Sequence, residues 1–437
     1  MSEAEAEHSP DSPDVDARRG ERARLILLLS LFAVLGLRAG WAVLAVIGAV
    51  VLMVFFHELG HYLTAKWSGM KVTEFFIGFG PRLWSFRRGE TEYGLKLIPA
   101  GAYVRIVGMS NLEEIDPADE PRSYRAQSFP KRLMVVCAGS AMHMILAFVM
   151  LALAFNLDVP GGTAFNPDEL TERWEIGRVV QPGDHSEPTP AFDAGLEEGD
   201  KVLAVDGTPV GTYPELVSQI RERGPGESAL FTVLRDGEVF DRRVVLAQHP
   251  AFPDQEVAYL GVVRGYSPVN RPPVEAVGHA GKELGLGLKE AVLALGRIFS
   301  PDGLSNYAEN VREGSEPTTT VSPTPRPERE NDDDDNRLLS IYGAVRLGAQ
   351  ITETGLVGFL LFVAQINLFI GLVNMAPLLP FDGGHAAVAI YERIRSRGGR
   401  RYRVDMAKLM PLTYAVVVAL VLLGITSLYL DVVRPVG

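Results

Sequence analysis

The apolar residues of this chain are gathered into long blocks and do not recur at the spacing of an amphipathic helix or a half-buried strand. The blocks cover residues 41–56, 133–155, 356–376 and 412–430. Each approaches the roughly 20 apolar residues that a helix needs to cross a hydrocarbon core about 30 Å thick. The pattern predicts a polytopic α-helical membrane protein of about four to five spans. We place the spans at residues 41–68, 133–156, 355–392 and 412–432.

Two segments have the composition of unfolded chain, and a third is ambiguous. Residues 1–24 are polar, charged and poor in aromatic residues, which predicts a flexible tail. Residues 304–337 combine Pro, Thr and Glu with the run Asp332–Asp335, which predicts a disordered acidic loop. The short apolar stretch within residues 25–40 is interrupted at Arg38, so it is either an extra span or an extension of the next helix.

Charge is distributed by region, and this predicts the orientation of the chain. The formal net charge is -12, but Lys and Arg are concentrated in residues 69–132 and 393–408, whereas residues 156–340 are acidic. Because cytoplasmic loops carry an excess of Lys and Arg, both basic regions are predicted to be cytoplasmic and residues 156–340 extracytoplasmic. The single cysteine, Cys137, excludes an intrachain disulfide framework and a multi-cysteine metal site.

A small folded domain is predicted within the extracytoplasmic part. Residues 175–265 alternate short Val-rich segments with Gly, Asp and Pro turns, and Tyr213–Arg223 has the pattern of a helix. The length, about 90 residues, lies within the usual range for one domain. We therefore expect an α+β domain inserted between two membrane spans.

The segment His57–His61 fits the HExxH pattern at the end of the first apolar run. Helical spacing puts His57 and His61 one turn apart on one face, where both can bind one tetrahedral Zn2+ ion. Glu58 is suited to act as the catalytic base that takes a proton from the attacking water. The alternative is an accidental match. Ionisable groups at membrane depth cost about 2.5–3.5 kcal/mol on insertion scales and are usually functional, which favours the metal site.

A catalytic zinc ion keeps three protein ligands and one open position, so two histidines require a third ligand from elsewhere. The stretch Asn374–His385 ends another apolar run, and its prolines and glycines break the helix. Asp382 is the predicted third ligand. The alternative is an aspartate that only caps the following helix.

With both motifs present in this order, the chain resembles the bacterial site-2 proteases, which are intramembrane zinc metalloproteases of regulated intramembrane proteolysis. The resemblance covers most of residues 41–430. In that family an HExxH helix pairs with an NxxPxxPxDG motif, matched here by Asn374, Pro377, Pro380, Asp382 and Gly383. The resemblance implies that Asn374, Pro377 and Gly383 bind substrate, with Asn374 holding the backbone of an unwound strand.

Two further segments carry the resemblance. Residues 78–104 resemble the family's membrane-associated β-hairpin, which would present an extended substrate strand on the cytoplasmic side. Gly195–Gly207 resembles part of the family's extracytoplasmic PDZ domain. PDZ domains bind extended segments by adding a strand to a sheet edge, so residues 175–265 are expected to filter substrates. A PDZ-like fold with a closed or unused groove is the alternative.

The segment Gly139–His143 departs from the family. Ser140 and His143 stand where the family usually has the proline and asparagine of Gly-Pro-x-x-Asn. His143 either contacts substrate or the zinc surroundings, or is a membrane histidine paired with a helix carbonyl, which we favour. His385 follows Asp382 by three residues and either supports the metal site indirectly or is an exposed histidine at a helix start.

The expected reaction is hydrolysis of a peptide bond in a single-span membrane protein, such as a pre-trimmed anti-sigma factor, near the cytoplasmic side. The substrate helix must unwind locally because its amides are buried in hydrogen bonds. Two alternatives are a zinc-binding PDZ membrane scaffold without proteolytic activity and a transporter. The intact Glu58 argues against the scaffold, and the absence of a second copy of either motif argues against the transporter. The expected partners are the substrate and the lipid bilayer of the cell membrane, with no nucleic acid.

Overall fold

The structure is a computed structural model of the 437-residue chain. It describes residues 24, 30, 32, 34–109, 114–157, 159–160, 174–181, 189–250, 255–266, 268–269, 272–315, 339–353, 355–396 and 402–433. The tail predicted for residues 1–24 therefore lies outside the described residues, apart from Arg24. The same holds for residues 316–337 of the predicted acidic loop. Residues 34–39 are helical, and of the candidate span at residues 25–40 the structure describes residues 30, 32 and 34–40.

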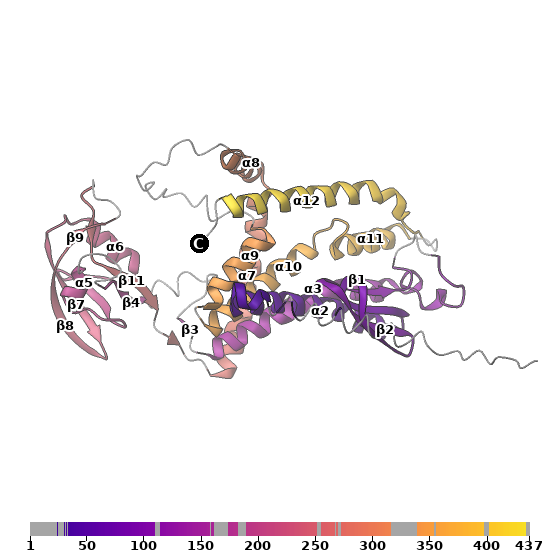
Figure 1. The fold of residues 1–437 in the computed structure, drawn as a ribbon, viewed down its shortest axis with the longest axis horizontal. Helices are drawn as coiled ribbons and strands as arrows, with labels where there is room; N and C mark the ends of the chain where they lie inside the picture. The colour runs from indigo at the N-terminus through magenta and orange to yellow at the C-terminus, as the bar shows by residue number, and fades with distance from the viewer. Residues whose placement is uncertain are drawn as a thin grey trace, which may run out of the picture. The chain divides into compact units, whose positions relative to one another are not determined.

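The chain divides into two compact units. The first comprises Met1–Met150, Ala291–Glu316 and Asn336–Gly437, and the second comprises Leu151–Glu290 and Pro317–Asp335. Figure 1 shows the elements of both.

Within the described ranges, four helices are long and apolar enough to cross a membrane. They are α2 (Trp41–Trp67), α3 (Phe129–Asn156), α10 (Leu356–Asn374), and the segment Met406–Val433, which consists of a short 3-10 turn and α12 (Met410–Val433). In the apolar 18-residue stretch of α2, only 17% is buried within the chain, and the same is true of the apolar stretch of Met406–Val433. Such low burial is expected for helices that face lipid. This agrees with the predicted polytopic helical class.

Two span boundaries differ from the prediction. The expected span at residues 355–392 is divided, because α10 ends at Asn374 and a separate helix, α11, covers Asp382–Arg395. The prolines between them cannot continue the hydrogen-bond ladder of α10. Helix α3 begins at Phe129, four residues before the predicted start, since Pro130 is tolerated in a first helical turn.

A long antiparallel hairpin follows α2. Strand β1 (Val72–Arg88) pairs with β2 (Thr91–Ile106), with several register shifts along the ladder. The base of the hairpin packs against the ends of three helices through one buried apolar cluster. The cluster consists of Ala65, Met70, Val72, Ile106, Tyr124, Val135, Val136 and Ala386. This cluster joins α2, α3 and α11 around the hairpin base.

Two short helices pack against α12. In α8 (Pro301–Ser315) the Tyr307 hydroxyl lies 2.6 Å from Thr426 Oγ1 on α12. Ser340, the residue just before α9 (Ile341–Glu353), donates its backbone N–H to the Asp431 carboxylate of α12 at 2.7 Å. The prediction of disorder from residue 304 onward is therefore wrong for the residues in α8. Composition could not reveal that Tyr307 finds hydroxyl partners on a helix more than 100 residues away.

The second unit contains a compact α+β core. Its four-stranded sheet has the order β6-β5-β7-β8, and helix α6 begins with a capping box in which Thr212 and Glu215 bind each other's backbone. Trp174, Leu216 and Phe231 are completely buried in the core. The bounds are β4 Trp174–Val179, α5 Pro190–Asp193, β5 Lys201–Val205, β6 Thr208–Pro209, α6 Tyr213–Arg221, β7 Ser228–Arg235, β8 Glu238–Val245, β9 Ala247–Gln248, β10 Ala258–Tyr259 and β11 Val262–Tyr266. Its assignment as a PDZ domain stays a prediction.

The remaining elements are short connections and one long helix. They are the 3-10 turns Glu120–Arg122 and Tyr124–Ala126, the strand pair β3 (Val159–Pro160) and β12 (Pro268–Val269), and the helix α7 (Pro273–Ile298).

Candidate metal centre

Helix α2 brings the two histidines of the HExxH segment together. Four residues apart on one face, His57 and His61 direct their Nε2 atoms to within 3.2 Å of each other. Their side chains are 12% and 6% exposed, so the pair is largely shielded from solvent. Two neutral imidazole nitrogens at this separation can serve one metal ion.

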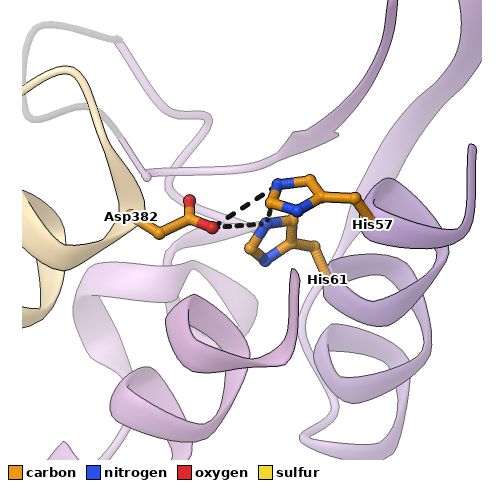
Figure 2. Close-up of side chains that lie close together, drawn as sticks. All are labelled: His57, His61 and Asp382. Atoms are coloured by element: carbon orange, nitrogen blue, oxygen red, sulfur yellow. Dashed lines mark hydrogen bonds and ion pairs between the residues drawn. The ribbon is translucent and has the colours of Figure 1, made fainter. Parts of the chain in front are cut away.

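Asp382 completes the group from a distant part of the chain. It is the first residue of α11, and its Oδ2 atom lies 3.4 Å from His57 Nε2 and 3.3 Å from His61 Nε2 (Figure 2). The capping position of α11 is Phe381, and no side-chain cap hydrogen bond is formed there. Thus Asp382 points toward the histidines and does not act as the helix cap of the alternative interpretation.

The three atoms fit one zinc ion. They form a nearly equilateral triangle with sides of 3.2, 3.3 and 3.4 Å. Two ligands held about 2.0–2.1 Å from a tetrahedral ion are separated by about 3.3–3.4 Å. Asp382 Oδ2 is also a buried oxygen for which no hydrogen-bond donor is found in the described part of the chain, as suits an oxygen that binds a cation.

The backbone of α3 orients one of the histidines. His61 Nδ1 lies 2.7 Å from the carbonyl oxygen of Val135. A carbonyl can only accept, so Nδ1 carries the proton and Nε2 keeps its lone pair for the space shared with His57 and Asp382. Sequence analysis did not identify Val135, because a backbone acceptor leaves no signal in residue type.

Gly139 makes room for both imidazole rings. A Cβ atom at this position would lie 2.5 Å from His61 Nε2 and closer still to His57 Cε1. On α2, a Cβ at Gly60 would lie 2.6 Å from the carbonyl oxygen of Ala138. The two helices therefore touch through glycines, as membrane helices commonly do. This helix contact could have been predicted from the sequence, because a glycine inside an apolar helical run often marks a close approach between two helices.

The turn that carries Asp382 also depends on glycine. A Cβ at Gly383 would collide with the carbonyl oxygens of Met375 and Ala376, and the backbone of Leu378 leaves no room for one at Gly384. Asn374 is half-buried at the end of α10, and Pro377 is exposed in the turn. Only glycine therefore fits the packing at position 383. Substrate binding by Asn374, Pro377 and Gly383 stays a prediction.

Glu58 faces the hairpin. The backbone of Val104 in β2 hydrogen-bonds to the half-buried Glu58 carboxylate. The carboxylate therefore stands between the helix that carries both histidines and a strand of the hairpin. This position is compatible with a base that acts next to the metal group.

His143 has a polar partner on another helix. Its Nδ1 atom lies 3.0 Å from Oδ1 of Asn367 on α10, and both residues are almost fully buried. The His143 ring is 5.0 Å from the His57 ring, centroid to centroid. The prediction that His143 pairs with a helix carbonyl is therefore wrong. Its partner, the Asn367 side chain, was not predicted from the sequence. His385 is half-buried beside Asp382 in α11, not exposed at the helix start.

Comparison with known proteins places the chain among the membrane metalloproteases. It belongs to Peptidase family M50, which matches residues 45–420. The predicted resemblance to bacterial site-2 proteases is therefore confirmed, and the protein is a zinc metalloprotease with several membrane-spanning helices.

Several relatives share most of the chain. The zinc metalloprotease Rip1 of Mycobacterium tuberculosis is 33% identical over 403 residues, covering 89% of this chain and 96% of the relative. Rip1 of Mycolicibacterium smegmatis is also 33% identical, with the same coverage of each chain. A protein of Brucella suis, provisionally named a zinc metalloprotease, is 28% identical over 78% of this chain and 83% of its own length.

Proposed function

We propose that this protein is an intramembrane endopeptidase that cleaves single-span membrane proteins, with zinc held by His57, His61 and Asp382 and with Glu58 as general base. The triangle formed by the two Nε2 atoms and Asp382 Oδ2 carries the proposal, because its sides of 3.2–3.4 Å suit three ligands of one tetrahedral ion. A fourth position stays available for water or substrate in such a site.

The residues around the metal group divide the chemistry between them. Bound zinc supplies Lewis-acid activation of water and of the scissile carbonyl. Glu58 takes a proton from the attacking water on its carboxylate and delivers it to the nitrogen of the departing amine. The hydrogen bond from Val104 holds that carboxylate in place between the two steps. Val135 and Gly139 keep the imidazoles in one orientation.

The hairpin is suited to hold substrate next to Glu58. Strands β1 and β2 form a two-stranded ladder, so each strand has one edge outside that ladder. An unwound substrate segment can add to such an edge through backbone hydrogen bonds. Val104 in β2 touches Glu58, so a strand added near it lies close to the base. Asn374 is proposed to bind the backbone of the same segment from the end of α10.

The charge pattern supports cleavage near the cytoplasmic side. His61 lies in the last third of α2 and His57 one turn before it. The end of this helix leads into the basic region 69–132. By the positive-inside rule this end is cytoplasmic. The acidic second unit is then extracytoplasmic, where its proposed PDZ domain would filter substrates. Single-span regulators such as anti-sigma factors are the proposed substrate class.

A pair of reporters tests the substrate class and the side of cleavage. Two single-span proteins would differ only in whether a helix-breaking Asn-Gly pair lies in the cytoplasmic or the extracytoplasmic third of the span. Each is reconstituted in liposomes with the zinc-loaded enzyme, and product masses locate the cut. We expect cleavage of the first reporter within its cytoplasmic third.

Other outcomes would count against parts of the proposal. Preferential cleavage of the second reporter would contradict the proposed side. If neither reporter is cut while the same enzyme preparation hydrolyses soluble peptides, the single-span substrate class is wrong.

A further inference from the structure

The first unit contains a basic cavity away from the metal group. Its volume is about 620 Å³, and it lies between the segment leading into α3, the end of α11 and the segment after α11. Of the described residues that line it, four are arginines and one is a carboxylate. They are Arg125, Arg132, Arg393 and Arg403, with Glu392 as the acid.

The single carboxylate of the lining is already neutralised. Arg132 Nη1 lies 2.6 Å from Glu392 Oε2, and both side chains are mostly buried. The other carboxylate oxygen of Glu392 accepts the backbone N–H of Val404 at 2.8 Å. This pair therefore forms a rigid, nearly neutral wall, because both oxygens are satisfied.

The other arginines leave a surplus of positive charge. Arg125 pairs with Glu120, which lies outside the lining, at 2.7 Å. Arg393 and Arg403 are exposed at the cavity. Guanidinium groups match the geometry of phosphate oxygens and bind them through paired hydrogen bonds. The occupant favoured by this charge is an anion that carries phosphate.

The cavity also lies at the level where two candidate spans begin. Helix α3 starts at Phe129, a lining residue, and the membrane-length segment Met406–Val433 starts three residues after Arg403. Lipid phosphates occupy this level of a bilayer, and basic pockets between membrane helices bind anionic headgroups. The positive end of the α3 dipole adds to the attraction. The volume lies within the range of about 300–1,000 Å³ that is typical of ligand pockets.

We propose that this cavity binds the phosphate of an anionic lipid headgroup, such as phosphatidylglycerol. The ligand sits between Arg393 and Arg403, with the Arg132–Glu392 pair as the wall behind it. A free phosphate ion has the same chemistry, and the test below separates the two sources. The site does not involve the metal group, so it does not depend on the proposed peptidase mechanism.

The test compares lipid retention in three forms of the full-length chain. They are wild type, the double variant Arg393→Gln/Arg403→Gln, and the control Arg87→Gln/Lys408→Gln, which removes the same charge from exposed positions outside the lining. Each is equilibrated in micelles containing equal amounts of phosphatidylglycerol and phosphatidylcholine, and retained lipid is counted by native mass spectrometry. The measurement is repeated with added inorganic phosphate.

We expect wild type and control to retain phosphatidylglycerol in preference to phosphatidylcholine, and the cavity variant to retain at least five-fold less. Arg393→Lys/Arg403→Lys should recover part of this retention because it restores the charge. Displacement of the lipid by inorganic phosphate would overturn the lipid assignment and leave free phosphate as the occupant. Equal retention by wild type and cavity variant, or no preference in wild type, would overturn the site itself.

Discussion

At the scale of single residues, the candidate metal centre depends on small side chains and backbone atoms as much as on its polar groups. His57, His61 and Asp382 meet because Gly139 leaves space beside both imidazole rings. The carbonyl oxygen of Val135 accepts a hydrogen bond from Nδ1–H of His61 and so fixes that ring. Any added atom at Gly139 must displace an imidazole or separate the helices. The residue types that bind metal are thus only part of what forms the group.

Substitution of Gly139 should weaken zinc binding without removing a ligand. In Gly139→Ala the new methyl carbon would lie 2.5 Å from His61 Nε2, well inside van der Waals contact. We expect zinc affinity to fall about 10- to 100-fold, the usual effect of disturbing the groups that orient ligands. Competition with a chelator measures it. Gly48→Ala on α2, where a Cβ meets nothing within 4 Å, is the control and should bind zinc normally.

The His143–Asn367 pair allows a test of a buried polar contact. His143→Leu removes the partner of a buried amide oxygen, and this should destabilise the protein by about 1–3 kcal/mol. Replacing both residues by leucine should cost less than the sum of the two single substitutions, since no unsatisfied group remains. Thermal unfolding in detergent measures all four forms. Strict additivity would show that the two side chains do not interact.

Residue patterns predicted the three members of the metal group but not the surroundings that position them. The HExxH spacing places His57 and His61 on one face in any helix, and the proline- and glycine-rich turn marks Asp382 as a residue where the chain reverses. Gly139, Val135 and Asn367 depend on which helices touch and in what register. Nothing local in the sequence specifies that register, so these contacts became visible only in the fold.

At the scale of elements, hydropathy predicted where the apolar helices are but not where they stop. The predicted span covers only the apolar stretch, whereas a helix can extend into polar residues as long as its backbone hydrogen bonds continue. Helix α3 therefore starts at Phe129, four residues before the predicted start. The break after Asn374 was signalled by prolines, yet α11 was merged with α10 because both are helical. Helix α8 was missed because its partners lie on α12.

A charged network attaches the hairpin to the adjacent elements. Glu90 in the hairpin turn lies 2.7 Å from Lys66 at the end of α2 and 2.7 Å from Arg122 in the connection to α3. The hydrogen bonds from Arg122, followed by those from Lys66, lower the pKa of Glu90 to about 2. The lowered pKa means that the ionised carboxylate stabilises the folded state.

Replacement of Glu90 should therefore have a pH-dependent effect. Since the folded pKa is about 2 and the unfolded value is about 4.5, the stabilisation is complete above pH 4.5 and is lost as the pH falls toward 2. We expect Glu90→Gln to cost about 1 kcal/mol at pH 7, because the network is partly exposed. The difference from wild type in thermal unfolding should shrink by pH 3. A difference of the same size at both pH values would exclude the ionised network as its cause.

At the scale of the whole molecule, apolar helices of membrane length and the group of His57, His61 and Asp382, which could hold a metal ion, occur in the same unit. The two motifs that supply the group lie more than 300 residues apart, and the entire second unit is inserted between them in sequence. This arrangement, with membership of Peptidase family M50, supports hydrolysis of peptide bonds at membrane depth. The central claim is that His57, His61 and Asp382 hold the zinc on which Glu58 depends as base.

The most direct test compares wild type with Glu58→Gln, with Asp382→Ala alongside, for zinc content and for cleavage of a single-span reporter. Glutamine keeps the shape of the side chain but cannot take the proton, so zinc content should be unchanged while cleavage falls at least 100-fold, within the range of about 10²–10⁴ for general-base catalysis. Asp382→Ala should lose both zinc and cleavage. Cleavage by Glu58→Gln at the wild-type rate, or full zinc content in Asp382→Ala, would contradict the account.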